Sequence, residues 1–549
     1  MGVRMKNEKH LEYPDSSLYD FVASRAVGHE KDCVLEYCSR KITYREWRDA
    51  VTQCAKALTV MGVKKGDAVS VCLPNIPQAV ILFYAINKIG AVVNMIHPLS
   101  AETEVAYYLS LAESQIIFVP DKLEEKINLA DLPVKHIIYV SLEEYMPRQV
   151  KLRLRLSKGH KKEKIKSEQS WTYFMNLANK YDVEPEYHGT GSDTAVILYS
   201  GGTTGKSKGI LLTNMNFNAL ALQSIEACGC LERGDHVLAV MPLFHGFGLG
   251  VCIHTTFVFG GVAILLPRYN PATFLKYIVK RKVNVVASVP TIYENLLMQD
   301  KYKIQDLSFV KCVISGGDSL STSTKRTLDR ILREHGSRAT VRVGYGLTES
   351  ATGCCLMPEG CTKLDSVGIP YADTYIKIID PVTEEEMPTG KSGEIVVRGP
   401  SVMKGYLREK RETRLVLRRH ADDEIWLHTG DLGYKDEEGY IYFRQRLKRM
   451  IVSNGYNIYP EVIENVINSC RDVLMCAVVG VPDKLRGERV KAFIVPKNLE
   501  CNRVGLKMEL LKLCEKNVAR YAIPKEFVFL DKLPLTVVGK IAYHKLIKL

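Results

Sequence analysis

The chain has 549 residues, of which 46% are apolar and 25% are charged. This composition is typical of a soluble globular protein with room for two or more domains. The net charge of +13 does not indicate a nucleic-acid surface, because residues 147–166 hold nine Lys/Arg and one Glu, +8 in total, and leave the rest near balance.

Residues 147–166 therefore form a basic segment that needs its own explanation. The simplest interpretation is a solvated insertion or flexible loop over about 147–168. The alternative is weak peripheral attraction to anionic lipid, at about 1 kcal/mol per basic residue near the surface. Apolar and basic residues alternate over 150–156, which predicts a strand rather than an amphipathic membrane helix.

The fifteen cysteines are scattered and include no Cys-x-x-Cys spacing. They predict free thiols in a reducing cytoplasm rather than a disulfide framework or a metal centre. Residues 1–14 are polar and charged, unlike a secretory signal. The longest apolar stretch, 251–267, is short of a membrane span, and we expect a buried helix, turn and strand there.

Hydrophobic periodicity predicts alternating helices and strands in the first 120 residues. Helices are expected over 17–27, 43–61, 78–89 and 102–111, and strands over 68–73, 91–96 and 115–119. A second alternating run has strands over 194–199, 236–240, 262–266, 285–288, 310–314 and 340–343. This alternation is typical of parallel sheets with crossover helices.

The pattern changes after this run. Residues 368–443 carry short strands with Gly and Pro turns, and the last hundred residues follow the order helix, strand, strand, helix, strand. We predict an α/β protein with a large N-terminal domain of doubly wound sheets and a small β unit, residues 1–447. A small α+β C-terminal domain, residues 448–549, follows it.

The clearest motif is the glycine-, serine- and threonine-rich stretch 199–209 after the strand 194–199. Glycines let backbone N–H groups approach a ligand, successive N–H groups form an anion site, and two lysines add positive charge. The stretch predicts a phosphate loop. It is not the NTPase P-loop, which requires a glycine where Ser200 stands. An ordinary glycine-rich linker is the other alternative.

Two further polar, glycine-bearing loops follow strands. Residues 315–318 follow one strand, and residues 344–350 follow another. Ligands in open α/β sheets lie beyond the carboxyl ends of the strands, so the three loops are expected at one edge. In 344–350, Tyr345 could stack on adenine, Thr348 could bind phosphate, and Glu349 is a hard oxygen ligand suited to Mg²⁺. An incidental turn is the alternative.

Two more groups suggest nucleotide chemistry, and a third is ambiguous by itself. Asp431 could accept hydrogen bonds from both ribose hydroxyls, although an Asx-turn would use the same residue. Lys540 follows Gly539 and could stabilise negative charge between a carboxylate and the α-phosphate, although a lone lysine is more often a surface residue. His245, in the segment 241–246, would by itself be interpreted as a core histidine.

Together these stretches resemble the AMP-forming acyl-CoA synthetases of the adenylate-forming superfamily. The loop 199–209 is similar to the family's Tyr-Ser-Ser-Gly-Thr-Thr-Gly-x-Pro-Lys-Gly, 345–349 to Tyr-Gly-x-Thr-Glu, and 429–431 to Thr-Gly-Asp. Residues 445–448 and 534–540 are similar to Gly-Arg-x-Lys/Asp and Pro-x-Thr-x-x-Gly-Lys. With the segment 241–246, which is similar to the family segment that gates the acyl site, six motifs occur in family order over nearly the whole chain. The sequence departs from the family patterns at positions next to the residues that carry the matched roles: Gly201, Ser207, Asn214 and Gln445.

The resemblance assigns a role to each matched residue. The predicted catalytic residues are Lys540, Glu349 (also the Mg²⁺ ligand), Thr348 and His245, which gates the acyl site. The predicted nucleotide- and CoA-binding residues are Ser200, Gly201, Gly202, Thr203, Thr204, Gly205, Lys208, Gly316, Gly317, Asp318, Gly344, Tyr345, Gly346, Asp431, Arg446, Lys448 and Gly455. Among these, Arg446 contacts ribose, Lys448 is the hinge of a mobile C-terminal domain, and Gly455 lies beside the pantetheine tunnel.

The predicted function is a cytoplasmic acid:CoA ligase. A carboxylic acid and MgATP give acyl-AMP and pyrophosphate, and CoA then takes the acyl group. Residues 241–261 contain no Asp or Glu to pair with a substrate amine, which favours an acid without an amino group, such as a fatty or aryl acid. We expect a medium- or long-chain fatty acid, with aryl acids second. The alternatives are a ligase that loads a carrier protein and a nucleotide-binding module without turnover.

Overall fold

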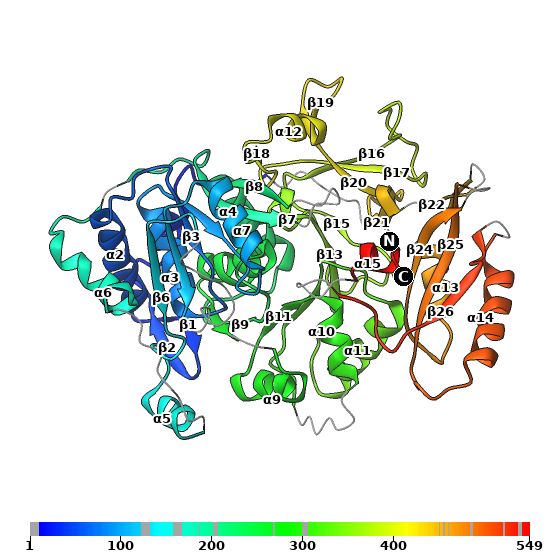
Figure 1. The fold of residues 1–549 in the computed structure, drawn as a ribbon, viewed down its shortest axis with the longest axis horizontal. Helices are drawn as coiled ribbons and strands as arrows, with labels where there is room; N and C mark the ends of the chain where they lie inside the picture. The colour runs from blue at the N-terminus through cyan, green and yellow to red at the C-terminus, as the bar shows by residue number, and fades with distance from the viewer. Residues whose placement is uncertain are drawn as a thin grey trace. The chain divides into compact units, whose positions relative to one another are not determined.

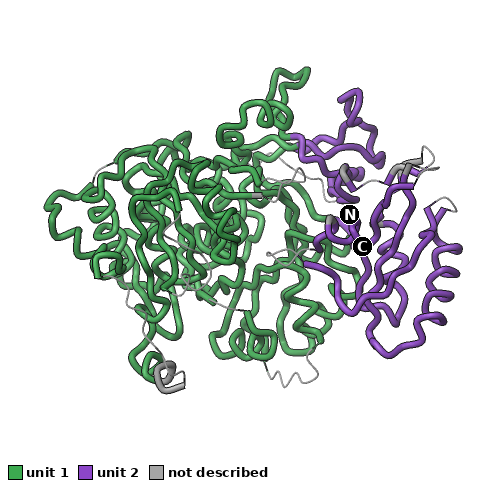
Figure 2. The backbone as a smooth tube through the Cα atoms, viewed as in Figure 1, with its two compact units in different colours: residues 1–363, 367–375, 397–427 green, residues 364–366, 376–396, 428–549 purple. Residues whose placement is uncertain are grey.

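A computed structural model describes residues 10–121, 132–157, 167–185, 187–200, 207–266, 269–298, 306–449, 451–453, 456–458, 460–483, 487–519, 522–535 and 541–549. The chain divides into two compact units (Figure 2). Unit 1 comprises residues 1–363, 367–375 and 397–427, and unit 2 comprises residues 364–366, 376–396 and 428–549. The structure is of the predicted α/β class.

One sheet of unit 1 has seven described strands in the order β18-β8-β7-β4-β3-β5-β6 (Figure 1). They are β3 (Ala68–Val71), β4 (Val92–Met95), β5 (Ile116–Pro120), β6 (His136–Val140), β7 (Thr194–Ser200), β8 (Lys208–Thr213) and β18 (Gly405–Tyr406). The strands from β7 to β6 pair in parallel, whereas β7–β8 and β8–β18 are antiparallel. The parallel part is the sheet that the alternating pattern predicts.

Helices that serve this sheet include α3 (Pro77–Lys88), α4 (Glu102–Ala112) and α7 (Asn214–Cys228). Helix α3 is buried along almost its whole length, as expected of a helix that is apolar on all sides. Helix α7 starts at the N-cap Thr213, whose hydroxyl accepts a hydrogen bond from Asn216 N. The chain therefore turns directly from β8 into α7.

The other sheet of unit 1 has nine described strands in the order β15-β14-β13-β12-β11-β9-β10-β1-β2. They are β1 (Cys33–Tyr37), β2 (Arg40–Thr43), β9 (His236–Ala239), β10 (Val262–Leu265), β11 (Val285–Ser288), β12 (Cys312–Ser315), β13 (Val341–Tyr345), β14 (Cys355–Leu356) and β15 (Ile369–Pro370). The β1–β2 hairpin was not predicted from the sequence; β1 pairs in parallel with β10, more than 200 residues later.

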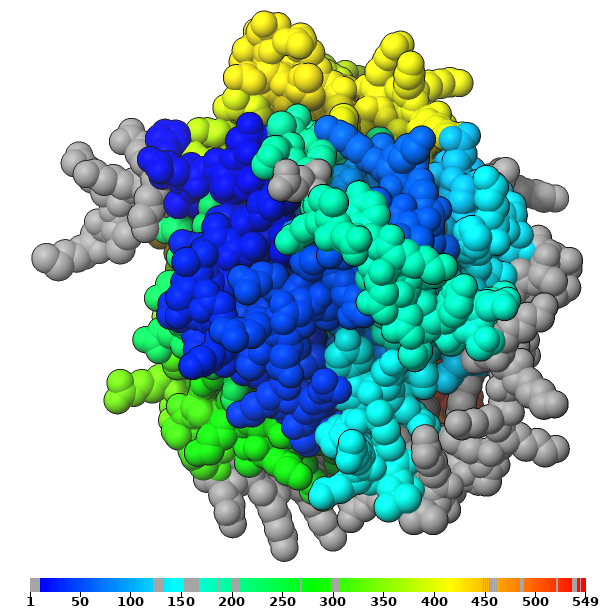
Figure 3. All heavy atoms as spheres, turned by 90° about the vertical axis from the view of Figure 1, so that its left-hand side faces the viewer, coloured from blue at the N-terminus to red at the C-terminus, as the bar shows by residue number. Residues whose placement is uncertain are grey.

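Further helices of unit 1 are α1 (Leu18–Arg25), α2 (Tyr44–Val60), α6 (Trp171–Asn176), α8 (Thr256–Phe259), α9 (Pro271–Arg281), α10 (Pro290–Leu297), α11 (Thr322–Glu334) and α12 (Lys410–Val416). Helices α1 and α2 confirm the two predicted N-terminal helices. Figure 3 shows the face of unit 1 on which residues of the first third of the chain, coloured blue to cyan, predominate.

The predicted strand over 150–156 is wrong: Arg148–Ser157 is the helix α5 (Figure 1). No described strand pairs with this segment, so its alternating pattern has no sheet to join. Leu, Arg and Lys are strong helix formers, and their propensity decides the local structure instead. Leu152 is 60% exposed, so the helix does not bury that apolar side chain.

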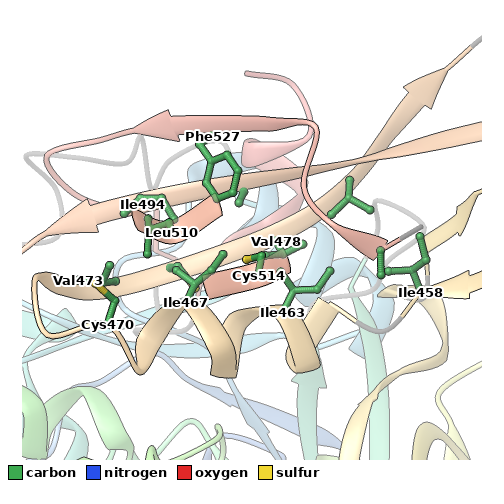
Figure 4. Close-up of a cluster of buried hydrophobic side chains, with 14 of the residues drawn as sticks. Ile458, Ile463, Ile467, Cys470, Val473, Val478, Ile494, Leu510, Cys514 and Phe527 are labelled. Atoms are coloured by element: carbon green, nitrogen blue, oxygen red, sulfur yellow. The ribbon is translucent and has the colours of Figure 1, made fainter. Parts of the chain in front are cut away.

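Unit 2 contains the predicted order helix, strand, strand, helix, strand. These elements are α13 (Pro460–Asn468), β24 (Val473–Asp483), β25 (Gly487–Pro496), α14 (Arg503–Asn517) and β26 (Glu526–Phe529). Strands β24 and β25 are antiparallel, and β26 pairs in parallel with β25. The two helices pack on this sheet through a core that includes Ile463, Ile467, Val478, Ile494, Leu510 and Phe527 (Figure 4).

Short strands lie between the alternating helices and strands of unit 1 and the last hundred residues, as predicted. Most residues of β16 (Tyr375–Ile379), β17 (Gly393–Arg398) and β20 (Ile425–Lys435) belong to unit 2, and the three strands are sheet neighbours in that order; β21 (Ile441–Arg446) pairs with β20. Among the described residues, no helix combines the length and the apolar character that crossing a membrane requires. All fifteen cysteines are free thiols, as predicted.

Candidate functional site

The end of one strand of unit 1 meets the segments that follow two others. A Cβ atom added to Gly246 would lie 2.8 Å from Thr352 Oγ1 and 3.5 Å from a methyl group of Leu198. Leu198 belongs to β7, Gly246 follows β9, and Thr352 follows β13. The last residues of β7 and the segments that follow β9 and β13 are therefore in contact, and Gly246 leaves the space that this contact needs.

The loop after β12 joins the same place. A Cβ atom on Gly316 would lie 3.5 Å from Gly344 O and 3.8 Å from the Phe247 ring. Gly346 is closer still to its neighbours, because a Cβ atom there would overlap Thr352 O at 2.0 Å. Only glycine fits that position. The loops predicted to converge at 316–318 and 344–350 do lie together.

The phosphate loop itself is described only at its ends. Residues 201–206 lie outside the described residues, so the roles of Gly201, Gly202, Thr203, Thr204 and Gly205 stay predictions. Strands β7 and β8 pair antiparallel up to Ser200 and Lys208, which brings the two ends of the loop together.

Tyrosines fix both ends of this loop. Tyr199 donates from its hydroxyl to Asn94 Oδ1 at 2.8 Å, and its ring centroid lies 4.0 Å from that of Tyr108. Tyr107 donates to Ser207 O at 3.3 Å. Tyr107 and Tyr108 both lie on α4, so one helix anchors the start and the end of the loop.

Lys208 and Glu349 are both held by Tyr406. The Lys208 ammonium lies 4.8 Å from the centroid of the Tyr406 ring and forms an ion pair with Glu412. The Tyr406 hydroxyl donates to Glu349 Oε1 at 2.9 Å. Among the described residues, no Lys, Arg or His forms an ion pair with Glu349, so its charge stays available to a cation. A carboxylate of this kind fits Mg²⁺.

Around Glu349, the predicted nucleotide-binding residues lie on β13 and the turn after it. Gly344 and Tyr345 are the last residues of β13, where they pair with Leu356 and Cys355, and Tyr345 is buried. Thr348 begins a single 3₁₀ turn, Thr348–Ser350. No hydrogen bond engages the Thr348 hydroxyl within the described part of the chain, so it can donate to a ligand.

His245 precedes a π-helix, Phe247–Thr255, that the sequence did not predict. Its Nδ1 accepts a hydrogen bond from Phe247 N at 3.2 Å, which assigns the proton of the neutral ring to Nε2. A Cβ atom on Gly248 would lie 2.1 Å from Pro242 O, so glycine permits this close turn. π-Helical turns occur often at functional sites.

Gly317 adopts φ = 82°, a conformation that favours glycine, and the exposed Asp318 accepts a hydrogen bond from Ser319 N at 2.9 Å. Burial raises the pKa of the nearby Glu294 carboxyl, and the negative charge of Asp318 raises it further. Glu294 lies on α10, and no sequence motif pointed to it.

Unit 2 brings Asp431 and Arg446 together. They are directly opposite on β20 and β21, and Arg446 Nε lies 2.7 Å from Asp431 Oδ1. Asp431 N donates to Thr429 Oγ1 at 3.0 Å, and Asp431 is only 1% exposed. The pairing agrees with a shared ligand for the two residues.

Glu394 positions the turn before Asp431, and sequence reasoning missed it. One carboxylate oxygen accepts from Gly430 N at 3.0 Å, and the other lies 3.0 Å from His428 Nδ1. Gly430 adopts φ = 68°, which favours glycine here. Gly455 and Lys540 lie outside the described residues, as does the side chain of Lys448, whose backbone forms part of a 3₁₀ turn, Leu447–Arg449. Their roles stay predictions.

Comparison with known proteins identifies the family. The family model described as AMP-binding enzyme matches residues 22–407, and that of the AMP-binding enzyme C-terminal domain matches residues 462–540. The long-chain-fatty-acid–CoA ligase of Bacillus subtilis (strain 168) is 33% identical, over 98% of this chain and 95% of the relative. The feruloyl-CoA synthase of Amycolatopsis sp. is 31% identical, over 91% and 92%.

A solved enzyme shares the fold. The o-succinylbenzoate coenzyme A synthetase of Bacillus subtilis, in complex with ATP and a magnesium ion, superposes with a TM-score of 0.77 at 26% identity, covering 96% of this chain and 98% of that chain. The same enzyme with its acyl-adenylate intermediate gives a TM-score of 0.78 at 25% identity, covering 98% of each. The predicted α/β fold and the predicted reaction class, ATP-dependent acid–CoA ligation, are therefore confirmed, and the chain belongs to the family of AMP-binding enzymes.

Proposed function

We propose that this AMP-binding enzyme joins a medium- or long-chain fatty acid to CoA through an acyl adenylate. The observation that supports this most is that the end of β7 and the segments after β9, β12 and β13 meet, and that Glu349, in the turn after β13, forms no ion pair with a described cation. Such an edge suits a nucleotide and an acid held side by side. The relatives that act on long-chain fatty acids and on ferulate support the substrate classes.

The chain's own residues supply binding and charge. In this proposal the loop 200–208 holds the phosphates with its N–H groups and Lys208, Tyr345 stacks on adenine, and Thr348 donates to phosphate. Asp431 and Arg446 hold the ribose. When bound at Glu349, Mg²⁺ would offset the negative charge of the ATP phosphates. The acid carboxylate then attacks the α-phosphorus, pyrophosphate leaves, and the CoA thiolate displaces AMP from the acyl group.

The acid is proposed to lie against the π-helix after His245. Phe247, Leu249 and Ile253 on this helix are buried and apolar, and residues 241–261 carry no acidic side chain. A substrate ammonium would therefore lack a partner here, whereas an alkyl chain would not need one. Aryl acids are the second class.

The proposed function also includes an acyl acceptor and a cellular location. Free CoA is the preferred acceptor, and a carrier protein is the alternative. The free thiols support the predicted cytoplasmic location. The exposed Leu152 and the basic residues of α5 support the alternative interpretation of the basic segment, weak contact with anionic lipid.

Lys540 is proposed to serve only the first half-reaction, on a C-terminal domain that begins at Lys448 and turns between two poses. Lys540→Ala should lower acid-dependent ATP–pyrophosphate exchange at least about 100-fold, the usual cost of losing a group that stabilises developing charge. Thioester formation from supplied acyl-AMP should change little. Lys548→Ala, at an exposed lysine in the same tail, is the matched control and should affect neither step. Equal loss of both steps in Lys540→Ala would overturn the two-pose proposal.

A further inference from the structure

Tyr406 lies between two residues that the sequence motifs place in separate roles. Strand β18, which carries Tyr406, pairs antiparallel with β8, which begins at Lys208 (Figure 1). Backbone bonds extend this pairing, because Leu407 N donates to Gly209 O at 2.7 Å and Lys404 N donates to Leu211 O at 3.0 Å. The ring of Tyr406 is thereby held beside the end of the phosphate loop.

The same segment also holds Glu349. Met403 N donates to Glu349 O at 2.8 Å, and the Tyr406 hydroxyl donates to Glu349 Oε1 at 2.9 Å. Residues 403–406 thus fix both the backbone and the carboxylate of Glu349. A hydrogen bond to one carboxylate oxygen orients the group and leaves the other oxygen for a ligand.

Helix α12 keeps Tyr406 in place. Tyr406 N donates to Thr413 Oγ1 at 2.9 Å, and Glu412 on the same helix pairs with Lys208. Gly405 adopts φ = 148°, and a Cβ atom there would lie 2.9 Å from Thr413 Cγ2. Tyr406 itself is 9% exposed, so the ring and hydroxyl have little freedom to reorient.

We propose that Tyr406 is a positioning residue for adenylation, which orients the Glu349 carboxylate toward Mg²⁺ through its hydroxyl and holds the Lys208 ammonium toward the phosphates through its ring. This inference rests on the proposed roles of Glu349 and Lys208. Groups that hydrogen-bond to metal ligands typically change metal affinity 10–100-fold when removed. The single side chain of Tyr406 therefore contacts both Glu349, the proposed Mg²⁺ ligand, and Lys208, the proposed phosphate-binding lysine.

The chain contains a matched control. The Lys65 ammonium lies 4.9 Å from the Tyr187 ring centroid, and the Tyr187 hydroxyl donates to Asp193 Oδ2 at 2.5 Å. This arrangement has the same three groups as Lys208, Tyr406 and Glu349, but no motif assigns a role to its residues. Tyr187→Phe therefore removes the same kind of hydroxyl–carboxylate bond elsewhere in unit 1.

The test compares Tyr406→Phe, Tyr406→Leu and Tyr187→Phe with the unmodified protein. Calorimetry measures ATP binding at a series of Mg²⁺ concentrations, and ATP–pyrophosphate exchange with a saturating acid gives the same Mg²⁺ midpoint from activity. In Tyr406→Phe the Mg²⁺ midpoint should rise about tenfold in both assays, while exchange at saturating Mg²⁺ changes less. Tyr406→Leu should also raise the ATP KM, because the ring beside Lys208 is lost. Tyr187→Phe should leave the midpoint unchanged.

A Mg²⁺ midpoint that is unchanged in Tyr406→Phe, or shifted equally in Tyr187→Phe, would overturn the inference. Thermal unfolding of each variant separates a folding defect from a loss of positioning, because Tyr406→Phe keeps the ring and should unfold near the unmodified protein. The proposed function fails separately, if the unmodified protein shows no acid-dependent exchange. Calorimetry would then still decide whether Tyr406 affects the Mg²⁺ dependence of ATP binding.

Discussion

Two places in unit 1 have the same three groups in the same arrangement. At Lys208, Tyr406 and Glu349, and again at Lys65, Tyr187 and Asp193, a lysine lies over a tyrosine ring whose hydroxyl donates to a carboxylate. The two carboxylates differ in the number of their partners, and this difference separates a group that can receive a ligand from one that stabilises the fold.

Both oxygens of the Asp193 carboxylate have partners. It accepts from Tyr187, from Thr190 N at 2.9 Å and from Thr190 Oγ1 at 3.1 Å, and Lys65 Nζ lies 3.5 Å from its other oxygen. Glu349 has one side-chain partner among the described residues, Tyr406. The arrangement of the three groups does not distinguish the two places. The number of partners of each carboxylate and the sequence motif around Glu349 do.

Removing the charge of each carboxylate should therefore give the largest contrast. Glu349→Gln should raise the Mg²⁺ requirement of ATP–pyrophosphate exchange at least about tenfold, because an amide is a poorer ligand for a hard cation. Asp193→Asn should leave that requirement unchanged and lower the stability toward urea instead. An unchanged Mg²⁺ dependence in Glu349→Gln would remove its proposed role as metal ligand.

Substitution of the two lysines should show the same contrast between the two places, with a smaller effect. Lys208→Met should raise the ATP KM about tenfold, because a charge-assisted bond to phosphate contributes on the order of 1.5–3 kcal/mol. Lys65→Met removes a side chain that is 61% exposed and should change the ATP KM less than about twofold. Similar KM values in the two variants would contradict the comparison.

The smallest expected effect is a pH dependence of stability at Asp193. Burial alone would raise the pKa of Asp193, but hydrogen bonds from Tyr187 and Thr190 outweigh it and lower the pKa to about 2. The ionised carboxylate therefore stabilises the folded state above the unfolded pKa of about 3.9, and this contribution is lost as the pH falls toward about 2. Urea unfolding should show the Asp193→Asn deficit at pH 7 and a smaller deficit near pH 3. A deficit that grows with acidity would contradict the assignment.

Much of this site could be predicted from the sequence, because the apolar runs of β7, β12 and β13 are followed by glycine and polar residues. Strand β11 was predicted at its observed bounds, and the ends of β7, β12 and β13 lie within two residues of the predictions. The meeting of the loops followed from sheet geometry. The matched pair Asp431 and Arg446 was also predicted to share a ligand, and the two side chains do lie together.

The missed features depend on contacts far apart in the sequence. Tyr406 ends a two-residue strand, β18, which is too short for any periodicity, and its partner Glu349 lies 57 residues away. The π-helix after His245 arises where Gly248 lets the chain turn closely over Pro242, which a 3.6-residue period does not reveal. The β1–β2 hairpin joins β10 across more than 200 residues.

The measurement that tests the central claim most directly is the nucleotide product formed with a panel of carboxylic acids. With ATP, Mg²⁺, CoA and a medium- or long-chain fatty acid, the account predicts equal amounts of AMP, pyrophosphate and acyl-CoA, and acid-dependent ATP–pyrophosphate exchange when CoA is left out. Formation of ADP and phosphate, or thioester formation without any exchange in the absence of CoA, would contradict it.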